Sequence, residues 1–146
     1  MKIRFADCDA SLKKRIGEVM GETAERHLNI DDGFSIVAMD MDDDQPVGII
    51  SVYPQALPDP LSETVEGFIN IIEVSPGYRR QGIARRLIET AVQYARRQGF
   101  HQLRAWSSDD KTEAIPMWKA LGFGLHPATV YPKGQEVKGF FVTCRV

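Results

Sequence analysis

The sequence predicts a single α/β domain in which one mixed β-sheet is covered by helices. Segments with the alternating or continuous apolar pattern of strands are interspersed with segments whose apolar residues recur every three or four positions, as in helices. The chain has 146 residues, the size of one ordinary domain, and we assign 1–146 to a single domain. The predicted order of elements is β-α-β-β-β-α-β-α-β-β.

The first half of the chain contributes four strands and one helix. Asp9 is a suitable N-cap for this helix, because its carboxylate can accept hydrogen bonds from free backbone N–H groups. Leu12, Ile16 and Met20 follow at helical spacing, and the helix is expected to end near 27–29. The strands are predicted at 2–5, 34–39, 47–53 and 67–74. The last of them has apolar residues on both faces, as expected for a central strand covered on both sides.

Two connections in this half have an unusual composition. Segment 40–44 is acidic and is predicted to be a solvated hairpin tip rather than a metal site. Segment 54–63 contains three prolines and is expected to be irregular, either a substrate loop or a stiff crossover.

The second half contributes two helices and three strands. The longer helix is predicted over about 81–97, with its inner face formed by Ile83, Leu87, Ala91 and Ala95 and its end set by Gly99. The other elements are a strand at 102–106, a helix at 112–121 closed by Gly122, and strands at 125–131 and 139–146.

Composition and charge exclude several classes of protein. Eighteen basic and 20 acidic residues give a net charge of -2, so we expect no nucleic-acid partner. No apolar run reaches the roughly 18 to 20 residues of a membrane helix, and we expect a cytoplasmic protein without a membrane partner. Cys8 and Cys144 could pair but are expected to be reduced. Two cysteines and three scattered histidines predict no metal site.

The segment from Arg79 to Ala84 follows a strand and a turn and opens a helix. A helix start has backbone N–H groups without intrahelical partners and carries partial positive charge, so it can bind a pyrophosphate. Gly82 and Ala84 keep this helix start small. The basic residues expected around it are Arg79, Arg80, Arg85 and Arg86.

Two common nucleotide motifs fail at this helix start. Gly77 and Gly82 have the spacing of a P-loop, but Ile83 and Ala84 occupy the positions that require Lys and Ser or Thr. The glycine triplet of a dinucleotide-binding turn is also absent. We therefore do not expect nucleotide hydrolysis.

Two segments resemble the motifs of one family. Val74–Ala84, with the core Arg-x-x-Gly-x-Ala, resembles the acetyl-CoA motif of the GNAT superfamily of N-acetyltransferases. Ala114–Phe123, a helix followed by Leu-Gly-Phe, resembles the second motif of that family. The resemblance extends along nearly the whole chain and implies a single mixed, mostly antiparallel central sheet with helices on both faces.

The resemblance also implies how acetyl-CoA, the co-substrate, would bind. Backbone amides would hold the pyrophosphate, and these belong to Arg79, Arg80, Gln81, Gly82, Ile83 and Ala84. The pantetheine arm would pair like an extra strand with the backbone of Ile72 and Val74. The thioester would lie where this strand separates from the strand at 103–106, since a splayed strand offers unpaired backbone groups.

The acid and the base of the reaction are less clearly indicated. Members of the family often have a tyrosine acid where this chain has Trp118, and an asparagine where it has Lys111. An indole does not donate a proton near neutral pH. Either another residue serves as the acid, with Tyr131 as the first candidate, or the thiolate leaves unaided. Trp118 is then expected to contact the cofactor arm or the core.

For the base, strand alternation places Glu66, Phe68 and Asn70 on one face of the central strand and Glu73 on the other. The resemblance implies a base, or a residue that orders a water, on the face of Glu66 and Asn70. A solvated Glu66 at the end of the strand is equally compatible with the sequence.

The predicted function is acetyl transfer from acetyl-CoA to a primary amine, by direct transfer in a ternary complex. The acceptor could be a small molecule or a peptide, and the protein a monomer or homodimer. Aromatic side chains favour a small amine, and the segments 54–63 and 131–139 are expected at the mouth of its cleft. The alternatives are a catalytically weak acyl-CoA-binding sensor or partner module and, more remotely, a nucleic-acid or phosphoprotein binder that uses the arginine cluster.

Overall fold

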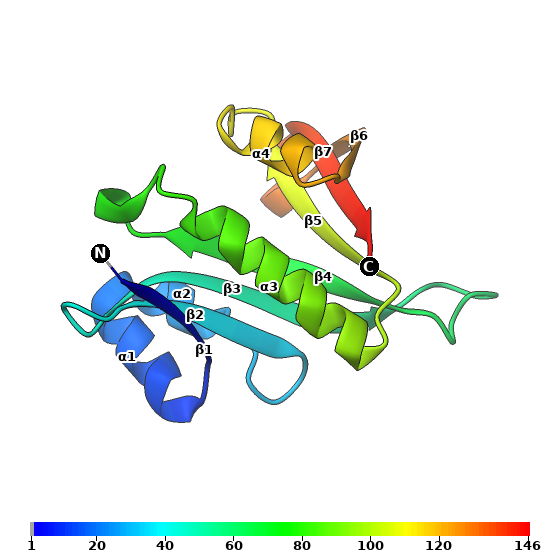
Figure 1. Ribbon diagram of the computed structural model, residues 1–146. Coiled ribbons are helices and arrows are strands. Elements are labelled where there is room, and N and C mark those ends of the chain that lie inside the picture. Colours follow the sequence, from blue (N-terminus) through cyan, green and yellow to red (C-terminus); the bar gives the residue numbers. More distant parts are fainter. Residues whose placement is uncertain (1) are drawn as a thin grey trace.

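The computed structural model describes residues 2–146 and confirms the predicted fold (Figure 1). The strands are β1 (Ile3–Asp7), β2 (Phe34–Asp40), β3 (Gln45–Ala56), β4 (Val65–Val74), β5 (Gln102–Ser108), β6 (Gly124–Val130) and β7 (Val137–Arg145). The helices are α1 (Ala10–Met20), α2 (Glu22–Arg26), α3 (Ile83–Gln98) and α4 (Ala114–Ala120), with short 3-10 helices η1 (Pro76–Tyr78) and η2 (Pro132–Gly134). One sheet has the order β1-β2-β3-β4-β5-β7-β6, and β4 and β5 are its parallel neighbours.

Two hydrophobic clusters hold the helices on opposite faces of this sheet. Ile16 and Leu28, from the α1–α2 region, pack with Val37 of β2 and Ile49 of β3. The larger cluster lies under α3 and α4 and includes Leu87 together with buried residues of every strand from β2 to β5. The central strands are therefore covered on both sides, as their apolar composition predicts.

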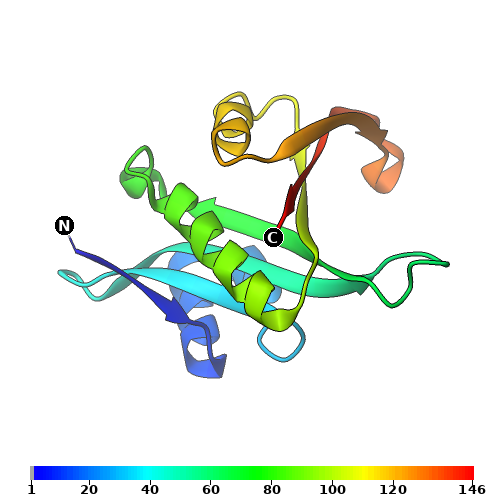
Figure 2. The same cartoon turned by 45° about the vertical axis from the view of Figure 1, so that its right-hand side comes forward.

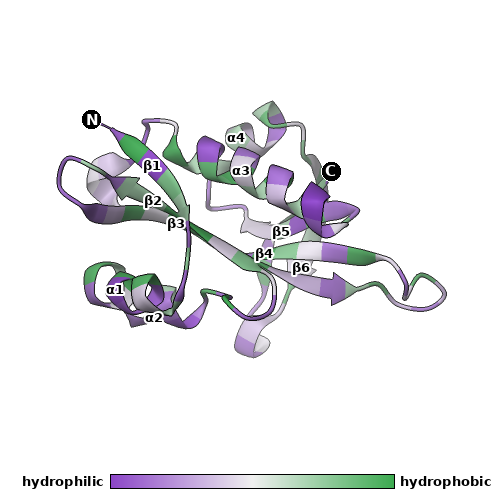
Figure 3. Cartoon of the chain, turned by 60° about the horizontal axis from the view of Figure 1, so that its bottom comes forward, coloured by the Kyte–Doolittle hydropathy of each residue, from purple (hydrophilic) through white to green (hydrophobic). Residues whose placement is uncertain are grey.

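Helix α3 has the predicted inner face and end. Its buried residues are Ile83, Leu87, Ile88, Ala91 and Ala95. Gly99 ends the helix with a left-handed φ of +80°, and its N–H bonds the carbonyl of Arg96 at 3.1 Å. Hydrophobic and hydrophilic segments alternate along α3 in Figure 3. Within residues 2–146, no helix combines the length and the apolar character needed to cross a bilayer.

The predicted helix from Asp9 to about 27–29 is wrong in one respect, because the chain forms two helices there. Asp9 does cap α1, accepting a hydrogen bond from the Leu12 N–H at 2.8 Å. Gly21 has a φ of +104°, which ends α1 and starts α2 in a new direction. This conformation suits glycine and lets Ala24 and Leu28 enter the core.

Both unusual connections are shorter than predicted. Asp40 is the buried last residue of β2, so the solvated turn begins at Met41. Strand β3 continues to Ala56, since Pro54 pairs with Gly67 of β4, and the irregular loop covers 57–64. This loop joins the beginning of β4, at the end where β4 and β5 lie together (Figure 1). The expectation that it lines the cleft mouth is therefore wrong.

Candidate functional site

The sheet opens between its two parallel strands. Pairing of β4 with β5 covers only Gly67–Ile69 against Leu103–Ala105, after which the two strands diverge (Figure 2). The edge of β4 that faces β5 has no partner strand from Asn70 onward. An unpaired strand edge leaves backbone N–H and C=O groups that an extended, amide-containing ligand can use.

A β-bulge occurs where the divergence begins. Ser51 of β3 pairs with Ile71, but its neighbour Val52 pairs with Ile69, so Asn70 is an additional residue in β4. The bulge changes which face the following side chains occupy. Glu73 lies opposite Ile49, a member of the cluster beneath α1, and therefore shares the α1 side of the sheet with Asn70. The prediction that Glu73 points to the other face is wrong for this reason.

The head of α3 presents free backbone N–H groups. The first hydrogen bond of the helix runs from the Arg86 N–H to the Gly82 carbonyl at 3.1 Å, and no side chain caps the helix at Gly82. Arg80 and Gly82 have left-handed φ values of +62° and +81°, which turn the chain sharply before the helix. A Cβ on Gly82 would meet no atom within 4 Å. The space in front of these N–H groups is open.

A groove of about 880 Å³ connects this helix head with the free edge of β4. Its volume is in the range of small-molecule sites. Of the predicted cofactor-binding residues, those that line it are Ile72, Val74, Arg79, Arg80, Gly82, Ile83 and Ala84. Gln81 is not among its lining residues, and its side-chain amide approaches the Gly77 carbonyl at 3.5 Å.

The four arginines near the helix head have separate roles. Arg79 donates from Nε to the Val74 carbonyl at 2.9 Å, and Arg80 pairs with Glu113 across the groove. Arg85 lines the groove, whereas Arg86 stacks over the Phe5 ring at 4.5 Å. The prediction that all four surround the binding site is thus wrong for Arg86. This dispersion also weakens the interpretation of the cluster as a nucleic-acid or phosphoprotein site.

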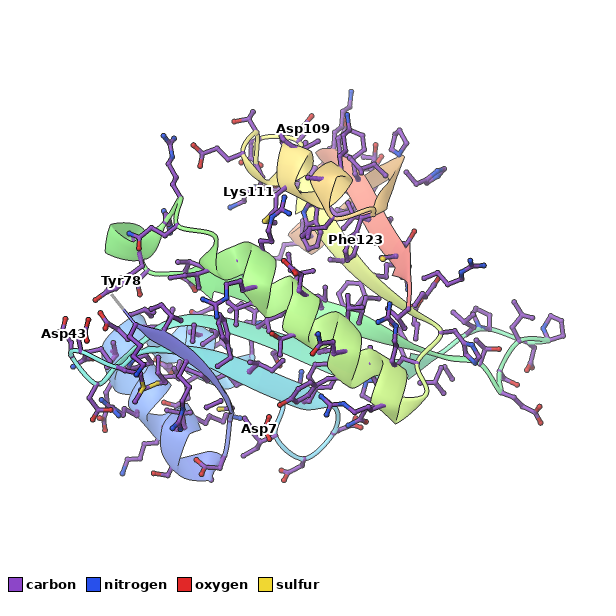
Figure 4. All side chains as sticks on the ribbon, in the orientation of Figure 1. Asp7, Asp43, Tyr78, Asp109, Lys111 and Phe123 are labelled. Carbon is purple, nitrogen blue, oxygen red and sulfur yellow. The ribbon has the colours of Figure 1, made fainter. Side chains whose placement is uncertain are left out.

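One contact that sequence reasoning missed holds the turn before this helix. The Tyr78 phenol, in η1, donates to Oδ2 of Asp40 at 2.8 Å, and Figure 4 shows Tyr78 near the β2–β3 turn that carries Asp43. This hydrogen bond holds the pKa of Asp40 below its ordinary value and raises the pKa of Tyr78. Tyr78 also lines the groove, so the contact fixes part of its wall.

A second cavity, of about 360 Å³, lies between the diverging strands. It shares Ile72, Lys111 and Met117 with the groove, so the two spaces are adjacent. Trp118 lines this cavity, is 3% exposed and packs on Phe123 with ring centroids 4.8 Å apart. Trp118 therefore belongs to the cleft and the core rather than to the groove at the head of α3.

Glu66 is buried at the closed end of the strand pair. It is 1% exposed and accepts hydrogen bonds from Arg104 Nε at 3.0 Å and Gln102 Nε2 at 2.7 Å. It lines neither the groove nor the cleft. The interpretation of Glu66 as a solvated residue is wrong, because the side chain is buried, and its ion pair with Arg104 gives no support to a role as base.

Asn70 lines the cleft, but its amide is engaged on both sides. Nδ2 donates to the His27 carbonyl at 2.8 Å, and Oδ1 accepts from Asn29 Nδ2 at 3.0 Å. Asn29 also donates to Ser51 Oγ at 2.8 Å. An amide has no basic group to accept a proton. Asn70 therefore ties the bulge to the segment that follows α2. It has no group that could act as a base, and its alternative role of ordering a water stays a prediction.

Tyr131, the predicted acid, is exposed on the connection between β6 and β7. It follows β6, is 63% exposed and lines neither the groove nor the cleft. The local sequence does not predict the exposure of Tyr131, because that exposure depends on how the connection between β6 and β7 folds.

Aromatic side chains cover the face of the sheet opposite α3, next to the cleft. Trp106 and Phe141 lie edge to face with ring centroids 5.0 Å apart. The ring centroids of Tyr53 and Phe68 are 5.5 Å apart. Arg104 joins the two pairs, with its guanidinium 5.6 Å from the Phe68 ring and 5.3 Å from the Phe141 ring. Trp106 belongs to both the aromatic face and the cleft.

Known proteins share this architecture over its full extent. A structure of NAA60 from Arabidopsis thaliana in complex with acetyl-CoA superimposes with a TM-score of 0.83 at 16% identity, covering 99% of this chain and 100% of that one. A GNAT-family acetyltransferase from Streptococcus pneumoniae gives a TM-score of 0.76 at 10% identity, with coverage of 99% and 100%. At these identities the likeness establishes the fold.

Sequence relatives cover part of longer proteins. N-acetyltransferase family 8 member 3 from Rattus norvegicus is 35% identical over 79 residues, which are 54% of this chain and 34% of that protein. N-acetyltransferase 8F1 from the same organism is 29% identical over 104 residues, or 71% of this chain and 45% of that protein. The chain thus spans between a third and a half of these relatives. The acetyltransferase (GNAT) family matches residues 8–123, and the chain belongs to this family.

Proposed function

We propose that this chain transfers an acetyl group from acetyl-CoA to a primary amine, by direct transfer in a ternary complex. The observation that carries the proposal is the continuous space from the uncapped head of α3, along the free edge of β4, to the cleft between β4 and β5. Phosphate-binding N–H groups and a strand-pairing edge meet in one groove, which is what a long phosphorylated thioester requires.

The residues present fit acetyl-CoA. The free N–H groups at the start of α3 would hold the pyrophosphate, with Arg85 adding positive charge along the groove. The backbone of Ile72 and Val74 would pair with the amide-containing arm; the Val74 carbonyl already accepts from Arg79. When bound, acetyl-CoA supplies an acetyl group activated as a thioester.

The acceptor is proposed to be a small-molecule or peptide amine that approaches from the face opposite α3. The cofactor groove occupies the α3 side, so the open path to the cleft crosses the aromatic face formed by Phe68, Trp106 and Phe141. This face can bind the apolar body of an acceptor. Within residues 2–146 no carboxylate or imidazole lines the cleft, so we propose that water takes the proton of the amine.

The first experiment measures acetyl-CoA affinity by calorimetry in two matched glycine variants. Gly82→Ala places a methyl group in the open space before the α3 N–H groups, and Gly99→Ala makes the same change at the other end of that helix. Both glycines have a φ near +80°, so both variants carry a similar strain of about 1 kcal/mol. We expect Gly82→Ala to weaken binding by about tenfold or more and Gly99→Ala to leave it unchanged.

The same proteins are then assayed for transfer to a panel of amines. Equal affinity of the two variants for acetyl-CoA would contradict the proposed groove. Tight binding of acetyl-CoA without product from any small amine or peptide would favour the sensor function. One feature favours a sensor: Trp118 lines the cleft at the position where a proton-donating tyrosine is common in the family.

A further inference from the structure

Lys111 lies where the cofactor groove meets the cleft between β4 and β5. It lines both spaces, together with Ile72, Ala114 and Met117. Figure 4 shows Lys111 beside α4, on the side toward the beginning of α3. The residue follows β5 and precedes α4. A long cationic side chain therefore starts at the junction of the two sites.

The backbone of Lys111 is held firmly between these two elements. Its N–H donates to the Ser108 carbonyl at 3.1 Å, and its carbonyl accepts from the Ala114 N–H at 3.0 Å. These bonds tie the residue to the end of β5 and to the first turn of α4. The origin of the side chain is thus fixed relative to the cleft, while the side chain itself is exposed.

The Lys111 ammonium has no anionic partner among residues 2–146. The ion pairs of this part of the chain are Arg15–Asp44, Arg80–Glu113, Arg104–Glu66 and Lys138–Glu136. Nearby in the groove, Arg80 is thus occupied by Glu113, and Arg79 donates to the Val74 carbonyl. Arg85 also lines the groove without an ion pair, but it does not line the cleft, so Lys111 is the cation available at the junction.

Lys111 is also the one ionisable side chain among the residues that line the cleft. The other polar groups there are the Asn70 amide, two serine hydroxyls and the Trp118 and Trp106 indoles. None of these is charged, and the Asn70 amide is already hydrogen-bonded on both sides. Among the residues that line the cleft, the Lys111 ammonium is therefore the charged group that could stabilise a negative charge developing there.

We propose that the Lys111 ammonium stabilises the thiol sulfur of CoA as it becomes the leaving group, a role that rests on the proposed acetyl transfer. In that reaction a bond forms between the amine nitrogen and the acetyl carbon, and the bond from that carbon to sulfur breaks. The electron pair of the broken bond goes to sulfur, beside the ammonium, and the excess proton of the amine goes to water. The thiolate leaves as the partner of the Lys111 ammonium and takes a proton from solvent after release.

Other charged and titratable groups face the same groove. They are Tyr78 of η1, Arg79, Arg80 and Arg85 near α3, Glu113 at the N-cap of α4, and Glu73 of β4, which borders the groove from the α1 side of the sheet. Tyr78 and Glu113 are engaged with Asp40 and Arg80, respectively. Asp110, in the same loop as Lys111, accepts a hydrogen bond from Ser108. A pH profile must therefore be compared between variants rather than interpreted from one protein.

A binding experiment tests the proposal without turnover. Calorimetry between pH 6.5 and about 9 compares CoA with dethio-CoA, which lacks the thiol and serves as the matched ligand. A nearby ammonium lowers the pKa of the bound thiol below its free value of about 8.5, so CoA should bind more tightly as pH rises toward that value. We expect the gain relative to dethio-CoA to be about tenfold for each unit by which the pKa is lowered.

The variants for this experiment are Lys111→Met and, as a control on the outer surface of α4, Lys119→Met. Lys111→Met should abolish the pH-dependent gain, and Lys119→Met should retain it. If wild-type protein binds CoA and dethio-CoA with the same pH profile, the role of Lys111 is refuted while the cofactor site stands. If neither ligand binds, the proposed function fails, and the role of Lys111 with it.

A chemical rescue tests the same charge during turnover. Lys111→Met should lower kcat by about 10- to 100-fold with little change in KM for acetyl-CoA. Alkylating Lys111→Cys with 2-bromoethylamine restores an ammonium of nearly the same length, and 2-bromoethanol gives a neutral side chain of similar size. Rescue by the amine and not by the alcohol is the expected result; equal rescue by both would overturn the proposal.

The two natural cysteines interfere little with this alkylation. Burial raises the pKa of Cys8 to about 11 and also raises the pKa of Cys144. Thiols with a raised pKa form little of the reactive thiolate at neutral pH. Wild-type protein treated with the same reagents serves as the control.

Discussion

At the scale of single residues, the Glu66 carboxylate was predicted as a catalytic group but stabilises the fold through an ion pair. Arg104 and Gln102 donate hydrogen bonds to it, and the Arg104 guanidinium lies 5.6 Å from the centre of the Phe68 ring and 5.3 Å from that of Phe141. Removing one partner of a buried ion pair strongly lowers the free energy of unfolding, because the charge of the other partner stays buried without compensation.

We therefore predict that Glu66→Gln lowers the free energy of unfolding by about 2 kcal/mol and leaves kcat nearly unchanged. The glutamine keeps the size of the side chain but removes the charge that Arg104 requires. Chemical denaturation and steady-state kinetics on the same preparation measure the two effects. A large loss of kcat with unchanged stability would return Glu66 to the role of base.

At the scale of elements, the binding groove depends on contacts that join segments far apart in sequence. The turn η1 precedes the helix head and is tied to the end of β2 by Tyr78 and Asp40. The bulge in β4 is tied to the segment after α2 by Asn70 and Asn29. The two anchors hold the two ends of the space proposed to bind acetyl-CoA: the head of α3 and the cleft between β4 and β5, respectively.

The anchor at η1 predicts a pH-dependent effect on stability. Its hydrogen bond lowers the pKa of Asp40 in the folded state, so its stabilisation is present above the unfolded value of about 3.9 and is lost as pH falls through the lower folded value. Tyr78→Phe should lower the melting temperature at pH 7, and the difference from wild type should shrink on acidification below about pH 4. Thermal melts from pH 2.5 to 7 measure this difference.

A difference in melting temperature that stays constant down to the lowest pH would contradict the role of Asp40. Acetyl-CoA affinity should also fall in Tyr78→Phe, because residue 78 lines the groove and the variant lacks the hydrogen bond that ties this part of the wall to Asp40. Tyr94→Phe is a matched control, since the Tyr94 phenol of α3 hydrogen-bonds Asp7 of β1 and neither residue lines the groove.

At the scale of the whole molecule, local patterns predicted the elements, and long-range contacts decided the site. The Asp9 cap, the inner face of α3 and the Gly99 end follow from local spacing, and all are confirmed. The ion pair of Glu66 depends on the pairing of β4 with β5, which no local pattern contains. The bulge at Asn70 is equally hidden, because strand alternation assumes that no residue is added.

The pieces of this fold meet in one space: a helix head with free N–H groups, a strand edge without a partner, and a cleft where two parallel strands separate. Amide hydrogen exchange tests this arrangement most directly. On addition of acetyl-CoA, exchange should slow at 72–74 in β4 and at 83–85 in α3, and stay unchanged in the β6–β7 hairpin. Unaltered exchange at both segments, in protein shown to bind acetyl-CoA, would place the ligand elsewhere and contradict the account.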